Sequence, residues 1–200
     1  MKYILVSLVL VLSPVAVFAH HPGERIDEVM AAREPAFEAT DLRRTPRLRA
    51  TDADGTPLRL DTMQDSIVVV SFAPEGCGAP CEAQQALLRE VQDGVNVTPM
   101  REMVTFLTVG PAAEGWDGTN WHAISIEGGI PQVSNDFAAL SSRDTDAPMI
   151  HVIARGGRHA AIFHGADFSH VNLILYINEL TNAAPPPEPG LLDSIFGVFQ

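Results

Sequence analysis

The sequence has little cysteine, few basic residues and only one long apolar run. Two cysteines among 200 residues cannot cross-link a disulfide-rich miniprotein, and cysteine alone cannot complete a zinc site here. The 13 Lys and Arg against 25 Asp and Glu give a formal net charge of −12, which argues against nucleic acid as a partner. A hydrophobic fraction of 46% is too high for a disordered chain. The length predicts one domain with a sizeable core.

The apolar run lies at the N-terminus, at residues 4–18, directly after Lys2 and Tyr3. The small residues Val17 and Ala19 fit a cleavage site after Ala19, so residues 1–19 are expected to be a secretory signal peptide. An uncleaved N-terminal membrane anchor is the alternative, although the run is short for a membrane-spanning helix. Either interpretation predicts an exported, periplasmic protein.

Two further segments are expected to lie outside the domain. Residues 20–45 form a polar N-terminal extension with a helix near 26–32. Residues 183–200 combine a stiff Pro-rich spacer with a short amphipathic tail. The tail either packs on its own domain or makes a peripheral contact with a membrane surface or a partner.

The remaining segment, 46–182, is expected to form one α/β domain. Strands are predicted at 48–51, 56–60, 66–72, 104–109, 148–154 and 158–163, and helices at 82–91, 137–140 and 168–180. The first helix has Ala83, Ala86, Leu87, Glu90 and Val91 at helical spacing, and Trp116 and Trp121 fall in a long loop. This order predicts a three-layer sandwich, with helices on both faces of a mixed central sheet and an N-terminal β-hairpin extension.

The two cysteines lie between a buried strand and a helix, in the segment Cys77-Gly78-Ala79-Pro80-Cys81. If the helix begins near Ala79, both sulfurs lie on one face, with Cα atoms about 6 Å apart, which a disulfide can bridge. The helix N-terminus also favours thiolate, which disulfide exchange and soft-metal binding both require. The simplest alternative is an inert disulfide that fixes the loop.

Residues 48–58, 67–72 and 77–81 together resemble the Sco/SenC branch of the thioredoxin superfamily, whose Cys-x-x-x-Cys copper site serves to build the CuA centre of cytochrome oxidase. The resemblance implies a thioredoxin-like fold. It also implies copper(I) delivery or thiol maintenance in respiratory oxidase assembly, with an oxidase subunit as the partner and Cu(I) bound by Cys77 and Cys81.

The chain departs from this family at one position, because Asp146 stands where Sco proteins carry a histidine. The following Ala147-Pro148 instead resembles the cis-proline junction of thioredoxin and TlpA-type reductases. His164 therefore becomes the candidate third copper ligand or proton shuttle. Among the other histidines, His151 is expected in the core, His159 and His170 at the surface, and His122 in a loop that could approach the site.

Three functional hypotheses remain open. The first is copper delivery or thiol maintenance by Cys77 and Cys81, with His164 as third ligand. The second is a metal-free thiol–disulfide oxidoreductase acting on a periplasmic thiol protein, in which Cys77 attacks, Cys81 resolves and Pro148 shapes the partner groove. The third is a non-catalytic interaction module with an inert disulfide.

Overall fold

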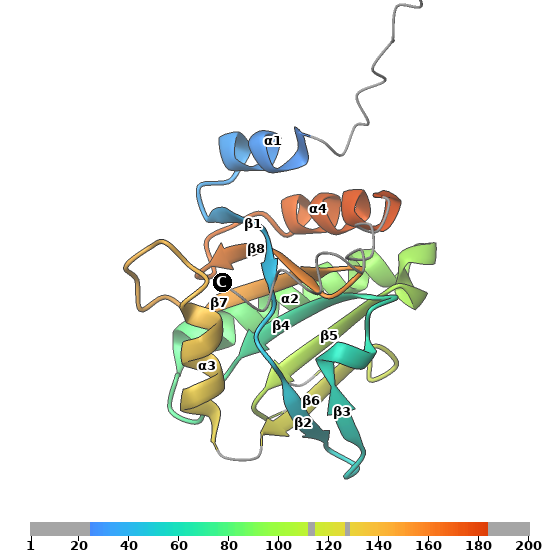
Figure 1. Ribbon diagram of the computed structural model, residues 1–200, viewed down its shortest axis with the longest axis vertical. Helices are drawn as coiled ribbons and strands as arrows, with labels where there is room; N and C mark the ends of the chain where they lie inside the picture. Colours follow the sequence, from blue (N-terminus) through green and yellow to red (C-terminus); the bar gives the residue numbers. More distant parts are fainter. Residues whose placement is uncertain (1–24, 112–114, 127–128, 184–200) are drawn as a thin grey trace, which may run out of the picture.

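One mixed sheet organises the part of the chain that the computed structural model describes, namely residues 25–111, 115–126 and 129–183. Its eight strands follow the order β1-β8-β7-β4-β5-β6-β2-β3 (Figure 1). The strands are β1 (Phe37–Arg44), β2 (Arg49–Asp52), β3 (Pro57–Arg59), β4 (Ile67–Phe72), β5 (Val104–Val109), β6 (Trp121–Ile126), β7 (Met149–Ala154) and β8 (Arg158–His164). The helices are α1 (Ile26–Arg33), α2 (Ala79–Asn96), α3 (Ile130–Ala138) and α4 (His170–Asn182), with short 3-10 turns η2 (Leu60–Thr62) and η3 (Pro99–Glu102).

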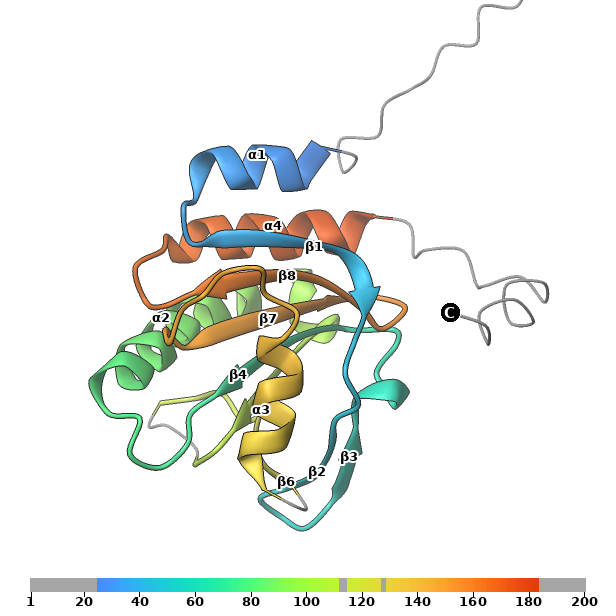
Figure 2. The same cartoon turned by 60° about the vertical axis from the view of Figure 1, so that its left-hand side comes forward.

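Helices cover both faces of this sheet. Helices α2 and α4 pack on one face and α1 lies over α4, whereas α3 covers the other face (Figures 1 and 2). Strands β4, β5 and β6 are parallel, while β7, β8 and β1 run antiparallel to their neighbours. The predicted three-layer α/β sandwich with a mixed sheet is therefore confirmed.

Strand β4 is buried along its whole length because both faces of the sheet are covered. Ile67 and Val69 pack with the α2 and α4 layer, and Val68 and Val70 pack with Phe137 of α3. The continuous β-branched run in the sequence therefore marks the centre of the sheet, directly before the cysteine loop.

The predicted β-hairpin is also present. Strands β2 and β3 pair antiparallel across the turn at Asp52–Gly55, where Gly55 has a φ of +88°. Strand β2 also pairs with β6, so the hairpin extends one edge of the sheet by two strands.

Two strands were not expected from the sequence. Strand β6 lies in the segment predicted to be a loop and pairs parallel with β5. Strand β1 lies in the segment predicted to precede the domain and pairs antiparallel with β8. The sheet therefore includes residues on both sides of the expected boundary between 45 and 46.

The helices also differ from the sequence prediction. Helix α3 spans 130–138 rather than 137–140, and Pro131 occupies its first turn, where a missing N–H costs nothing. Helix α2 extends to Asn96, and its buried face agrees with the predicted one only in part: Val91 is buried and Leu87 packs against the core, but Ala83 and Ala86 are exposed. The buried residues are Cys81, Gln84, Gln85, Leu88, Val91, Gln92 and Val95.

No helix within the described ranges is long and apolar enough to cross a membrane. The expected signal peptide at 1–19, the Pro-rich spacer and the tail at 191–199 lie outside the described residues.

Candidate functional site

Cys77 and Cys81 form a disulfide at the N-terminus of α2, with Cα atoms 5.8 Å apart. The predicted bridging distance is thus observed. Gly78, at the N-cap, has a φ of +68°, a backbone conformation that suits glycine, and Pro80 lies in the first helical turn. Cys77 is half-buried, whereas Cys81 is only 5% exposed. The two sulfurs therefore differ in how readily another molecule can reach them.

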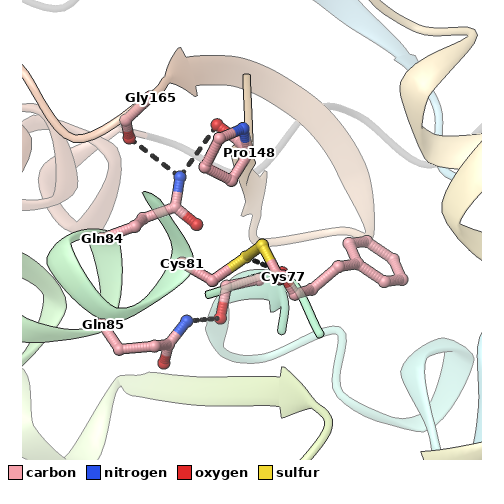
Figure 3. Close-up of a disulfide and its surroundings, with 8 residues drawn as sticks. Cys77, Cys81, Gln84, Gln85, Pro148 and Gly165 are labelled. Atoms are coloured by element: carbon pink, nitrogen blue, oxygen red, sulfur yellow. Dashed lines mark hydrogen bonds between the residues drawn. A yellow bond between two sulfur atoms is a disulfide. The ribbon is translucent and has the colours of Figure 1, made fainter. Parts of the chain in front are cut away.

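Gln84 connects the disulfide region to the segment around Pro148. The Gln84 side chain is fully buried one turn after Cys81, and its Nε2 donates to the carbonyl oxygens of Pro148 and Gly165, each at 2.9 Å (Figure 3). Figure 3 shows Pro148 near the disulfide, with its carbonyl bound by Gln84. No peptide bond in the described part of the chain is cis, so the Ala147–Pro148 bond is trans and the expected likeness to a cis-proline junction is wrong in this respect.

A ring of buried hydrogen bonds lies next to the disulfide on its other side. Gln85 Nε2 donates to Ser71 Oγ at 3.1 Å, and the hydroxyl of Thr108 donates to Gln85 Oε1 at 3.2 Å. Ser71 Oγ and Thr108 Oγ1 are 2.8 Å apart, and Trp121 Nε1 donates to Thr108 at 2.9 Å. The ring joins α2 to β4, β5 and β6, and it fixes the helix that carries Cys81.

A cavity of about 390 Å³ opens beside the disulfide. Both cysteines line it, together with Gln85 and Trp116, and Trp116 stacks on Trp121 with ring centroids 4.1 Å apart. Glu75 and Glu82 place carboxylates in its wall. Arg89 also lines the cavity, so its charged lining is two carboxylates and one guanidinium, and a side chain of another molecule could contact this surface and Trp116 while its sulfur approaches the disulfide.

Comparisons with known proteins bear on this geometry. No protein-family model matches the chain, and no curated protein matches its sequence. Among solved structures, BsSco, a member of the Sco family of cytochrome c oxidase assembly proteins, matches with a TM-score of 0.58 at 11% identity, over 72% of this chain and 96% of that one. A SCO1/SenC family lipoprotein from Bacillus anthracis str. Ames matches with a TM-score of 0.55 at 14% identity, over 70% of this chain and 96% of that one. A thiol:disulfide interchange protein of the thioredoxin family from Chlorobium tepidum TLS matches with a TM-score of 0.50 at 15% identity, over 70% of this chain and 96% of that one.

The fold is thioredoxin-like. At these identities the likeness shows the fold alone, and within it the resemblance to Sco/SenC proteins predicted from the sequence is supported. The thioredoxin-like sheet presents the Cys77–Cys81 disulfide at the junction between the central strand β4 and α2. Asp146 is exposed in the segment before β7.

His164 lies at the end of the thioredoxin-like β8, opposite Met149 of β7. Its Nε2 is 2.7 Å from Glu38 Oε2. Burial opposes ionisation of Glu38, but hydrogen bonds from Ser142, Ser141 and His164 outweigh it and lower the pKa of Glu38 to about 2. For His164, burial lowers the pKa and outweighs the hydrogen bond to Glu38, which raises it. A neutral His164 therefore donates its Nε2–H to the carboxylate, and its Nδ1 is left buried without a hydrogen-bond partner.

The other histidines occupy varied positions. His151 is in the core, as predicted, with Nδ1 3.0 Å from Nε2 of His159. His159 is also fully buried, so the predicted surface position is wrong. His170 is partly exposed and pairs with Glu90, and His122 pairs with Asp52.

Three metal-ligating side chains are not gathered at the disulfide. Within residues 25–111, 115–126 and 129–183, no group of three or more His, Cys, Asp or Glu is arranged to hold a metal ion. Cys77, Cys81 and His164 therefore do not form a three-ligand copper centre in this oxidised arrangement. Reduction would supply two thiolates, the ligand type that Cu(I) prefers.

Proposed function

We propose that the protein is a thiol–disulfide redox protein that cycles Cys77 and Cys81 between disulfide and dithiol. The observation that carries the proposal is the disulfide at the N-terminus of α2, with a half-buried Cys77, a buried Cys81 and an adjacent cavity. The free N–H groups of the first helical turn favour a thiolate at this position.

The reaction needs two exchange steps. In the reduced protein, the Cys77 thiolate attacks one sulfur of a partner disulfide, forms a mixed disulfide and releases the other partner sulfur as a thiolate. Cys81 then attacks Cys77 Sγ, re-forms the Cys77–Cys81 bond and releases the second partner sulfur. Two electrons pass to the partner, and the two protons of the dithiol end on its sulfurs.

The partner that fits this site is an exported thiol protein with basic residues near its cysteines. The net charge of −12 favours such a surface, and at the cavity Glu75 and Glu82 outnumber Arg89. Pro148, held beside the disulfide by Gln84, is the expected contact for the partner backbone.

Trapping the mixed disulfide tests this function. Cys81→Ser should accumulate a covalent adduct with an oxidised basic peptide, seen by mass spectrometry, whereas Cys77→Ser should not. Equal adduct formation by both variants would contradict the assigned roles. A wild-type disulfide with a potential far below that of the glutathione pool would favour the inert-disulfide alternative.

Copper(I) delivery to a respiratory oxidase subunit is a second candidate, and the ring of His164 favours it. Metal-bound histidines commonly donate one ring N–H to a carboxylate and bind with the other nitrogen, and His164 has this arrangement toward Glu38 with a free Nδ1. The fold likeness to BsSco, a member of the Sco family of cytochrome c oxidase assembly proteins, supports the respiratory oxidase as the destination.

A Cu(I) titration of the reduced protein tests the second candidate. We expect one Cu(I) per chain, lost in Cys77→Ser and weakened in His164→Ala, with His170→Ala as the matched control on a partly exposed histidine. Unchanged affinity in His164→Ala would reject His164 as a ligand, and absent binding by the wild type would reject copper delivery.

Both candidates place the protein outside the cytoplasm, with residues 1–19 as the export signal. N-terminal sequencing of the protein recovered from a periplasmic fraction should start at His20. A start at Met1 in a membrane fraction would favour the anchor.

Flotation with vesicles, compared between the full chain and a chain ending at Ala183, tests contact of residues 191–199 with a membrane.

A further inference from the structure

Trp116 is the aromatic side chain among the described residues that line the cavity beside the disulfide. Its ring stacks on Trp121, with 10° between the ring planes and 4.1 Å between the centroids. Trp121 is 3% exposed and donates from Nε1 to Thr108, so the ring on which Trp116 rests is fixed. Trp121 covers one face of the Trp116 ring, and the opposite face is the largest surface that remains to border the cavity.

The backbone on both sides of Trp116 is held by helix α2, which also carries the disulfide at its N-terminus. On one side, Asp117 N donates to Gln92 Oε1 at 3.0 Å. On the other side, Gly115 has a φ of +85°, and a Cβ at this position would lie 3.2 Å from Arg89 Nη1. The ring is therefore placed relative to the two sulfurs by the helix from which one of them projects.

The indole N–H of Trp116 is buried and has no hydrogen-bond acceptor in the part of the chain that the structure describes. A buried indole usually finds an acceptor, and a donor without one is costly. The position of the ring is thus not explained by its own hydrogen bonding, and such a group calls for a functional or structural explanation. What the position provides is a rigid aromatic surface next to the reactive sulfurs.

Charged side chains surround this aromatic surface. Glu75 and Glu82 contribute two carboxylates to the cavity wall, and Arg89 contributes one guanidinium that already interacts with other groups of the chain. A cation over the face of an indole ring is attracted by the negative charge density of that face. A guanidinium is also planar and stacks on aromatic rings, which an ammonium group does not do. The side chain that fits both the ring and the carboxylates is therefore arginine.

We infer that Trp116 sets the specificity of the exchange reaction, because its uncovered face binds an arginine side chain next to the reactive cysteine of the partner. The inference rests on the proposed thiol–disulfide function. In the mixed disulfide the partner cysteine is bonded to Cys77, which lines the same cavity of about 390 Å³ as Trp116. A side chain adjacent to that cysteine can enter this cavity, where Glu75 and Glu82 balance its charge.

A pair of chromogenic peptide disulfides tests the inference. Each peptide has one cysteine bonded to 5-thio-2-nitrobenzoate and flanked either by arginine or by citrulline, which has a similar shape and no charge. The reduced protein forms its Cys77–Cys81 bond, and the two electrons of its dithiol leave a peptide thiol, a thionitrobenzoate anion and one proton. The absorbance of the anion gives the rate. The wild type should react about tenfold faster with the arginine peptide.

Trp116→Leu should reduce this preference to about twofold, and Trp116→Phe, which keeps an aromatic face, should retain most of it. The preference is a ratio of two rates of the same variant, so a general change in cysteine reactivity or in the folded fraction cancels. Glu82→Gln should also lower the preference. Glu90→Gln is the matched control, because it removes the same charge from the same helix at a carboxylate that pairs with His170, and it should keep the wild-type preference.

Equal rates of the wild type with the two peptides overturn the inference and leave the proposed function intact, because exchange still takes place. A full preference in Trp116→Leu overturns the role of Trp116. Equal losses in Glu82→Gln and Glu90→Gln would mean that only the long-range field of the acidic chain acts, which overturns the inference as well and does not depend on how the Trp116 variants fold. If the wild type reacts with neither peptide, the proposed function itself is rejected.

Discussion

Three buried hydrogen bonds meet at the hydroxyl of Thr108. Its hydrogen goes to Gln85 Oε1, so it must accept from Trp121 Nε1 and from Ser71. Ser71 in turn accepts from Gln85 Nε2. The direction of every bond in the ring is thus fixed, and removal of one hydroxyl leaves several buried groups without partners.

We therefore predict that Thr108→Val, which keeps the side-chain shape, lowers the free energy of unfolding by about 2–3 kcal/mol. Urea unfolding followed by tryptophan fluorescence measures it. Thr105→Val in the same strand, at a half-buried position outside the ring, is the matched control and should change stability by less than about 0.5 kcal/mol. Equal effects of the two substitutions would mean that the ring adds no stability.

At this scale the sequence reveals the cysteines but not their neighbours. The spacing of Cys77 and Cys81 and the adjoining strand and helix predict a pair that a disulfide can bridge, and the structure has that bond. Gln84 and Gln85 are missed because glutamines on a helix are usually solvent-facing. The one available signal is their position, three and four residues after Cys81, on the same helical face as Leu88 and Val91.

At the scale of elements, strand β1 shows why a polar segment can belong to a sheet. It occupies an edge, its last four residues are exposed, and Phe37 and Thr40 are its buried residues. The ring of Phe37 packs edge-on against Phe163 at 5.4 Å and against Tyr176 at 5.0 Å. One aromatic side chain therefore anchors this edge strand to β8 and α4.

Phe37→Ala should accordingly lower the free energy of unfolding by about 3–5 kcal/mol, because it leaves a cavity among aromatic rings. Denaturant unfolding measures the loss, and Val97→Ala at an 85% exposed position is the control. The same reasoning predicts that a fragment starting at residue 46 unfolds at lower denaturant than one starting at residue 25. Equal denaturation midpoints of the two fragments would mean that residues 25–45 add no stability, in line with the domain boundary at residue 46 expected from the sequence.

Strand β6 was missed for a different reason. Trp121 and Ile124 are buried, but they are three residues apart and do not give the alternation that indicates a strand. The segment before it is rich in Gly, Asp and Asn, which favours a loop. Pairing with β5, which no local pattern records, creates the strand. The central strands β4, β5, β7 and β8 were predictable because burial on both faces selects continuous apolar runs.

At the scale of the whole molecule, a histidine pair makes stability depend on pH. Thr40 Oγ1 donates to the His159 carbonyl, so His159 Nδ1–H donates to Thr40, and His159 Nε2 accepts from His151. Both rings are therefore neutral in the folded protein. Burial lowers the pKa of His151 well below its usual value and that of His159 from 6.5 to about 4.

Acidification should consequently destabilise the protein before most of its carboxylates titrate. Below pH 6.5 the unfolded chain takes up a proton at His159 that the folded protein refuses until about pH 4, so stability falls with pH across this window. Between pH 7 and pH 5, His159 alone should remove about 2 kcal/mol from the free energy of unfolding. Urea unfolding at both pH values measures the difference, which should shrink in His159→Gln because an amide does not titrate. Gln92→Met, which lowers stability without removing a titratable group, should keep the full difference. If the free energy of unfolding of the wild type is equal at pH 7 and pH 5, the folded protein accepts a proton at His151 or His159 as readily as the unfolded chain does.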